Sequence, residues 1–289
     1  MSRPPTFVPP PCARSRVLAT SRGDFAVLDA RPDGDTVKGT ALLLPGFTGS
    51  KEDFIVLLEP LTSAGYRVVS VDGRGQYESE GPTEQEAYAQ EALARDVLAQ
   101  AEAVRDGDAG DGSLHLLGHS LGGQIARAAV LLDPSPFRTL TLMSSGPARI
   151  SSGQRERVKL LSDALAVMRM EEVWEAMRTL DPPVDTDTDP KNGEDLRHRW
   201  LSNNPLQLIA TGGQLTREPD RVDELAALRT LPKHVLSGET DDAWPVPVLD
   251  AMAERLGAQR TVIAGAEHSP NTDRPQETAA AIRAFWDRH

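Results

Sequence analysis

Short, uninterrupted apolar runs alternate with segments of helical periodicity through most of this chain. This alternation constrains the fold more than any other feature. The run Thr40–Leu44 ends at Pro45-Gly46, and Tyr66–Val71 is a second run of the same kind. Continuous apolar runs of this length are typical of strands buried on both faces, as in parallel sheets. Strands that alternate with helices predict an α/β fold with a mostly parallel central sheet flanked by helices.

The other elements can be placed from the same patterns. A hairpin is expected within Val17–Leu28, with its turn at Ser21–Asp24. Beyond the two runs above, strands are expected at Leu114–Leu117, Arg138–Met143, His234–Leu236 and Arg260–Ile263. Helices are expected at Asp53–Ala64, Glu84–Arg105, Leu121–Leu132, Val222–Leu228, Val248–Leu256 and Pro275–Asp287.

The alternation is interrupted from about Ser151 to Leu215. Only helical patterns occur there, together with an expected acidic loop at Asp181–Asp195. The interruption predicts a helical cap, or lid, inserted into an α/β core. The expected division is a flexible N-terminal tail at 1–14, a core at 15–147 and 217–289, and the cap at 148–216.

Charge and hydropathy exclude several classes of partner. The 289 residues carry a net charge of −12, so the basic footprint of a nucleic-acid-binding protein is missing. No apolar run reaches the ~18 residues of a membrane-spanning helix, and Met1–Pro11 lacks the apolar core of a signal peptide. We therefore expect a cytoplasmic protein with no nucleic-acid partner and no integral membrane association. The oligomeric state stays open.

The segment Leu114–Val130 contains the motif that carries chemistry. Its Gly118-His119-Ser120-Leu121-Gly122 lies between an expected strand and an expected helix, the context of a G-x-S-x-G nucleophile elbow. The flanking glycines permit a sharp turn that exposes the Ser120 hydroxyl. The helix that starts at Leu121 directs its N–H groups there, so the Leu121 N–H is a candidate oxyanion donor. The alternative is a glycine-rich turn in which Ser120 caps the helix.

Two downstream segments favour the catalytic interpretation. His268 lies in a loop that follows the last expected strand, where it can reach the elbow. The segment Gly238–Pro245 follows the strand before it and contains Asp241 and Asp242. A carboxylate there can orient the imidazole of His268 and stabilise its charged form. Adjacent side chains diverge, so only one of the two aspartates is expected to reach it.

From Val17 to His289 the chain resembles the α/β-hydrolase fold superfamily, and among its members serine hydrolases of the esterase and lipase kind. The resemblance rests on the segments PGFTGS (45–50), DGRGQYES (72–79), GHSLGG (118–123), GETDDAWP (238–245) and GAEHSP (264–269). It implies an α/β-hydrolase fold with an inserted helical cap. The chain order Ser…Asp…His is also the order of this fold.

The resemblance also assigns two residues. The pattern Gly-x-x-Asp-x-x-x-Pro places the acid at Asp241, and the PGFTGS segment makes the Phe47 N–H the second oxyanion donor. Many relatives have histidine where this chain has Pro45. The donor is a backbone group, so the difference has little consequence.

These residues imply acyl transfer in two steps. Ser120 attacks a carbonyl, His268 accepts its proton, Asp241 holds His268, and water then hydrolyses the acyl-enzyme. The expected substrate is a small or medium carboxylic ester, including thioesters and lipid esters, and no cofactor is needed. The alternatives are hydrolysis of a carbon–carbon bond or a perhydrolase reaction by the same serine, and a non-catalytic ligand-binding member of the fold.

Tryptophans and acidic residues outside the motif have simpler interpretations. Trp244 lies next to the expected acid and is a candidate wall of the substrate pocket. Trp174 and Trp200 are candidates for the same pocket, with packing inside the cap as the alternative. No metal site is expected. The acidic run Asp185–Asp189 lacks the glycine and glutamate that an EF-hand loop needs at its sixth and twelfth positions.

Overall fold

A computed structural model describes residues 3–34, 37–106, 114–180 and 190–289 of the chain. Within these residues an eight-stranded sheet has the order β1-β2-β4-β3-β5-β6-β7-β8. Its strands are β1 (Ala13–Thr20), β2 (Gly23–Ala30), β3 (Gly39–Leu44), β4 (Tyr66–Val71), β5 (Leu114–His119), β6 (Thr139–Met143), β7 (Lys233–Gly238) and β8 (Gln259–Ile263). All the strands expected from the sequence are therefore present.

The direction of the strands determines where a site can form. β1 and β2 form the expected antiparallel hairpin, and β2 pairs antiparallel with β4. From β4 to β8 every neighbouring pair is parallel. β3, β4 and β5 are buried along their whole length, as their continuous apolar runs predict. The carboxyl ends of six strands therefore lie at one edge, and the loops that carry the sequence motifs all leave from it.

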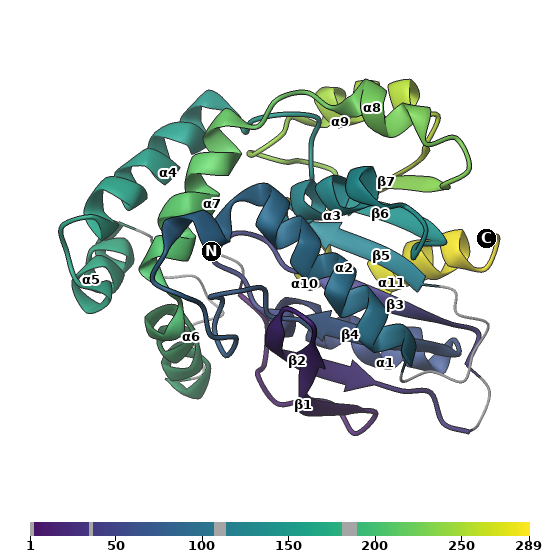
Figure 1. The fold of residues 1–289 in the computed structure, drawn as a ribbon, viewed down its shortest axis with the longest axis horizontal. Helices are drawn as coiled ribbons and strands as arrows, with labels where there is room; N and C mark the ends of the chain where they lie inside the picture. The colour runs from purple at the N-terminus through teal and green to yellow at the C-terminus, as the bar shows by residue number, and fades with distance from the viewer. Residues whose placement is uncertain (1–2, 35–36, 107–113, 181–189) are drawn as a thin grey trace.

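Helices cover both faces of the sheet (Figure 1). The helices outside the 148–216 region are α1 (Ile55–Ser63), α2 (Gln90–Asp106), α3 (Leu121–Leu132), α8 (Val222–Ala227), α9 (Val246–Leu256), α10 (Pro270–Asp273) and α11 (Pro275–Trp286). α2, α3, α8 and α9 share one hydrophobic core with the sheet. α1 and α11 share the core on the opposite face. This is the α/β fold, a mostly parallel central sheet flanked by helices, that the sequence predicts.

Among the described residues, four helices separate β6 from α8, and in Figure 1 they lie together at one side of the sheet. They are α4 (Ser152–Leu165), α5 (Met170–Leu180), α6 (Pro190–Ser202) and α7 (Pro205–Arg217). The expected acidic loop at Asp181–Asp195 was too long, because α6 already begins at Pro190. The other residues of the expected loop, 181–189, which include Asp185, Asp187 and Asp189, lie outside the described residues.

The N-terminal segment packs against this helical group. Phe7 contacts the cluster that contains Trp200, and its ring lies edge-on to that of Tyr77 at 6.3 Å. The division into tail, core and cap stays a prediction. In the described part of the chain, no helix combines the length and the apolarity that crossing a membrane requires.

Candidate active site

The turn between β5 and α3 holds Ser120 in a strained backbone conformation. Its φ and ψ are 54° and −118°, in a region that residues with a side chain rarely adopt. Its N–H donates to the Met143 carbonyl at 2.9 Å, which ties the turn to the neighbouring strand. The Ser120 side chain makes no helix-capping hydrogen bond. The alternative of a merely capping serine therefore finds no support.

Close packing explains the glycines beside Ser120. A Cβ atom at Gly118 would overlap the backbone of Gly122, and one at Gly122 would overlap the carbonyl oxygens of Leu44 and Pro45. Because these neighbours are backbone atoms, they cannot rotate away as a side chain would. The tight turn and the close approach of β3 to α3 therefore both require glycine.

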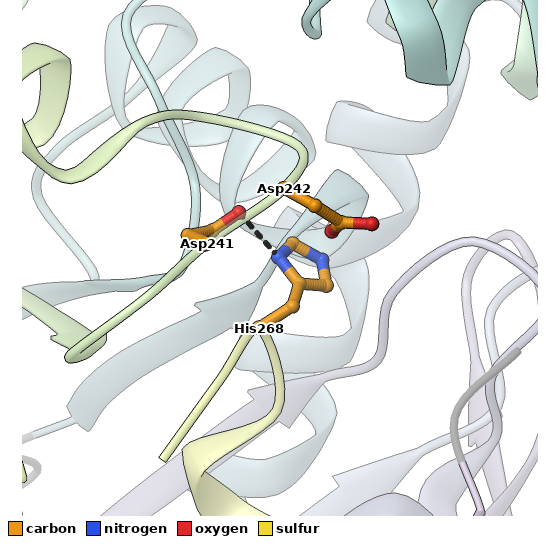
Figure 2. A group of neighbouring side chains, drawn as sticks. All are labelled: Asp241, Asp242 and His268. Carbon is orange, nitrogen blue, oxygen red and sulfur yellow. Dashed lines mark hydrogen bonds and ion pairs between the residues drawn. The ribbon is translucent and has the colours of Figure 1, made fainter. Parts of the chain in front are cut away.

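His268 lies between Ser120 and Asp241. Its Nε2 is 3.0 Å from Ser120 Oγ, and its Nδ1 is 2.9 Å from Asp241 Oδ1. The Asp241 side chain is fully buried, whereas that of His268 is 27% exposed. Because a carboxylate can only accept a hydrogen bond, Nδ1 carries the proton toward Asp241. Nε2 can then accept the serine proton. Figure 2 shows the Asp241–His268 contact.

Asp241 and Asp242 have different surroundings. Asp241 Oδ1 also accepts the N–H groups of Ala243 and Trp244 at 2.9 Å each, so the loop fixes its direction. Asp242 is exposed and its carboxylate accepts a hydrogen bond from Gln154 on α4. Only one aspartate hydrogen-bonds His268, as the divergence of adjacent side chains predicts.

The same three side chains could by composition hold a metal ion. One ligand atom from each of Asp241, Asp242 and His268 lies within 4.8 Å of the others, the one such group among the described residues (Figure 2). However, Nδ1 of His268 donates to Asp241 and Nε2 faces Ser120, so both ring nitrogens already have hydrogen-bond partners. The arrangement fits proton transfer better than metal binding.

Two backbone N–H groups are candidate oxyanion donors beside the serine, those of Phe47 and Leu121. Gly46 lies against Ser120, since a Cβ atom there would be 3.2 Å from that of Ser120. Within the described part of the chain, neither the Phe47 N–H nor the Leu121 N–H has a hydrogen-bond acceptor. Backbone N–H groups without an acceptor next to a nucleophile can stabilise a developing oxyanion. A side chain also supports the loop 45–50, because Gln76 Nε2 donates to the Gly46 carbonyl at 3.1 Å.

An ion cluster around the buried Lys51 lies at the end of the 45–50 loop. Lys51 Nζ lies 2.8 Å from Asp72 and 2.6 Å from Glu78, and its N–H donates to Asp72 at 2.7 Å. Burial raises the pKa of Asp72 to about 7, although Lys51 opposes this. Burial alone would lower the pKa of Lys51, but Asp72 and Glu52 outweigh it and hold that pKa above its ordinary value.

The three candidate pocket tryptophans occupy two environments. Trp244 is buried, its ring centroid lies 6.2 Å from that of His268, and its Nε1 donates to the Ala148 carbonyl at 2.8 Å. Trp174 and Trp200 are buried in one cluster with residues of α4 to α7. Trp200 Nε1 donates to the Met170 carbonyl at 2.9 Å. Trp244 thus borders the candidate site, whereas the other two pack within the helical group.

A small cavity of about 30 Å³ lies behind the elbow. Leu121 and Gly122 line it, together with polar residues that include Gln100 and Gln207, but Ser120 and His268 do not. The side-chain oxygens of Gln100 and Gln207 are buried without a partner. A volume of this size can hold a water molecule but is too small for a substrate.

Two residues beside the site have contacts that the motifs did not predict. Gln76 lies in the DGRGQYES segment and supports the 45–50 loop. His119 lies inside the elbow, and its Nε2 is 2.9 Å from the carbonyl oxygen of His268. Strand alternation could have indicated the face on which His119 lies, but not the loop that crosses it.

Comparisons with known proteins show the family of the chain. The model of the Alpha/beta hydrolase family matches residues 41–281. The chain is 24% identical over 275 residues to a Bacillus subtilis protein provisionally named 2-succinyl-6-hydroxy-2,4-cyclohexadiene-1-carboxylate synthase, covering 90% of this chain and 94% of that one. It is 27% identical over 180 residues to a pimeloyl-[acyl-carrier protein] methyl ester esterase of Aeromonas hydrophila subsp. hydrophila, covering 59% and 69%.

A solved structure shows the same fold. A thermophilic esterase from Thermogutta terrifontis superimposes with a TM-score of 0.74 at 23% identity, covering 96% of this chain and 99% of that one.

Proposed function

Because this chain belongs to the alpha/beta hydrolase family, we propose that it is a serine hydrolase that cleaves a small or medium carboxylic ester through an acyl-enzyme. One observation carries the proposal: the imidazole of His268 spans Ser120 Oγ at 3.0 Å and Asp241 Oδ1 at 2.9 Å. The methyl ester esterase among its relatives supports an ester substrate. Thioesters and lipid esters react by the same route and belong to the proposed class.

In the proposed mechanism, Ser120 Oγ attacks the ester carbonyl while Nε2 of His268 accepts its proton. The Phe47 and Leu121 N–H groups stabilise the oxyanion. His268 then protonates the leaving alcohol, and the acyl group stays on Ser120. A water molecule, deprotonated by His268, releases the carboxylic acid and restores the serine. Each step uses groups of this chain and water, so no cofactor takes part.

The helices α4 to α7 are proposed to form a cap over this site. Ser151, which caps α4, contacts the loop of the acid, since its N–H donates to the Ala243 carbonyl at 2.8 Å. Phe47 packs against both the core of the α2–α3 face and the helical group. With Trp244 on the other side, the cap would border the acyl group of a small-molecule substrate.

A second candidate function uses the same serine on a carbon–carbon bond. The observation behind it is that the relatives differ in their named reactions, since one is named as a synthase and the other as a methyl ester esterase. Chemistry other than ester hydrolysis is therefore compatible with a chain of this fold.

Labelling with a fluorophosphonate tests the proposal, because this probe reacts with activated serines. We expect the wild type to label, Ser120→Ala to lose labelling, His268→Ala to lose most of it, and the exposed Ser135→Ala control to keep it. A panel of p-nitrophenyl esters of rising chain length then measures the preferred acyl group. A wild type that does not label contradicts the proposal. Labelling without ester hydrolysis favours the second candidate.

A further inference from the structure

The residue before the nucleophile contacts two other parts of the proposed machinery. We infer that His119 is a positioning residue that fixes the backbone of His268 and, through it, the imidazole that faces Ser120. The inference rests on the proposed function of Ser120, Asp241 and His268. His119 is 2% exposed and lies at the end of β5, directly before the strained turn.

The hydrogen bond between the two histidines has one possible direction. His119 Nε2 lies 2.9 Å from the carbonyl oxygen of His268, and a carbonyl can only accept. Nε2 of His119 therefore carries the proton. The ring centroids of the two histidines are 5.2 Å apart, so the donor and the imidazole that it positions are direct neighbours.

The other nitrogen of His119 faces the 45–50 loop. Nδ1 is buried and has no hydrogen-bond partner among the described residues. A Cβ atom at Gly46 would lie 3.2 Å from this nitrogen. The ring thus fills the space between the His268 loop and the loop that carries the Phe47 N–H, and one side chain sets the spacing of both.

His119 is also suited to its place by being uncharged. Burial, together with the neighbouring His268, lowers the pKa of His119 to about 4. Asp53 and Asp241 act in the opposite direction but are weaker. The proposed reaction turns His268 into an imidazolium, and a second positive ring beside it would oppose that step. A neutral donor holds the loop without this penalty.

Two variants of His119 separate the effect of its hydrogen-bond donor from the effect of its size. His119→Leu removes the donor, whereas His119→Gln keeps an amide N–H near the place of Nε2. His115→Leu is the matched control, since His115 lies on the same strand and face and is also 2% exposed, but bonds Thr139 instead. The assays are ester hydrolysis, the rate of fluorophosphonate labelling and thermal unfolding.

We expect His119→Leu to lower kcat and the labelling rate by about 10- to 100-fold with KM changed less than about threefold, because a displaced catalytic group slows chemistry more than binding. His119→Gln should recover most of that loss. His115→Leu should lower the unfolding temperature and keep kcat. A kcat of His119→Leu within about twofold of the wild type, or a Gln variant as slow as Leu, would overturn the inference.

A measurement on the wild type covers the case in which His119→Leu does not fold. Nitrogen-15 NMR of the histidine rings reports which nitrogen of His119 carries the proton. We expect the proton on Nε2, and a proton on Nδ1 would overturn the inference, since Nε2 could then not donate. A wild type that fails to label contradicts the proposed function instead, so the two failures are distinguishable.

Discussion

Two adjacent aspartates illustrate how residue-scale surroundings assign chemical roles. The Asp241 side chain is fully buried and accepts three N–H groups, from Ala243, Trp244 and His268. The Asp242 side chain is 63% exposed. Position after the strand alone left both residues within reach of His268, and only the resemblance to the α/β-hydrolase fold assigned the acid to Asp241. In the structure, the direction of each side chain distinguishes the orienting acid from the surface group.

We predict that Asp241→Asn lowers kcat by about 10³- to 10⁴-fold, because an amide N–H stabilises the wrong tautomer of His268 and does not balance its positive charge. Asp242→Asn is the matched control, since it removes the same charge one residue away, and it should keep kcat within about threefold. Steady-state ester hydrolysis measures both. Equal losses in the two variants would mean that the acid is wrongly assigned.

At the scale of elements, a buried ion pair joins the nucleophile helix to the helical group α4–α7. Arg127 on α3 donates to the carbonyls of Gly146 and Pro147, which precede α4. It also bonds Glu218, which ends α7, at 2.6 Å. The side chains of Arg127 and Glu218 are 2% and 4% exposed. One guanidinium thus holds both ends of the helical group against the helix that follows Ser120.

We predict that Arg127→Met lowers the free energy of unfolding by about 3–5 kcal/mol, because Glu218 would be left charged and buried without its main partner. The double variant Arg127→Met with Glu218→Met should recover part of this loss. Arg255→Met, which removes an exposed arginine paired with Asp220, should cost less than about 1 kcal/mol. Urea denaturation measures all three. A loss below 1 kcal/mol in the buried single variant would show that the pair does not stabilise the junction.

At the scale of the whole molecule, buried neutral histidines link stability to pH. Burial, with Arg288 and Arg260 nearby, lowers the pKa of His234 to about 3. In the unfolded chain a histidine has a pKa of about 6.5. Between these values the unfolded chain binds a proton that the folded chain does not, so acidification favours unfolding. The contribution of the neutral His234 side chain to the free energy of unfolding is complete above about pH 6.5 and is lost as the pH falls toward 3.

We predict that His234→Gln makes stability less sensitive to acid. When the pH falls from 7 to 5, the free energy of unfolding should fall by about 2 kcal/mol less in the variant than in the wild type. Each pH unit is worth about 1.4 kcal/mol per titrating group. Thr261→Val is the control: it removes the hydroxyl 2.9 Å from His234 Nε2 but keeps the titrating ring. Urea denaturation at the two pH values tests this. A pH dependence identical to the wild type's would contradict the pKa direction.

Local patterns in the sequence determined most of the fold and part of the site. The strands β3 to β8 follow from apolar runs, and their alternation with helices predicts the parallel sheet, because these preferences act over a few neighbouring residues. Ser120 and His268 were recognisable as candidates from their places after strands. The sequence pattern extended the expected acidic loop to Asp195, whereas α6 begins at Pro190. The start of this helix was missed because the first turn of a short polar helix has little hydrophobic periodicity.

Tertiary structure decided what depends on residues far apart in the chain. The bond from His119 to the His268 carbonyl joins residues 149 positions apart, and that from Arg127 to Glu218 joins residues 91 apart. Tertiary packing also placed Trp244 beside His268, and it placed Trp174 and Trp200 inside the helical group. Such contacts depend on how the elements pack, and packing brings together side chains whose local sequence carries no sign of their partners.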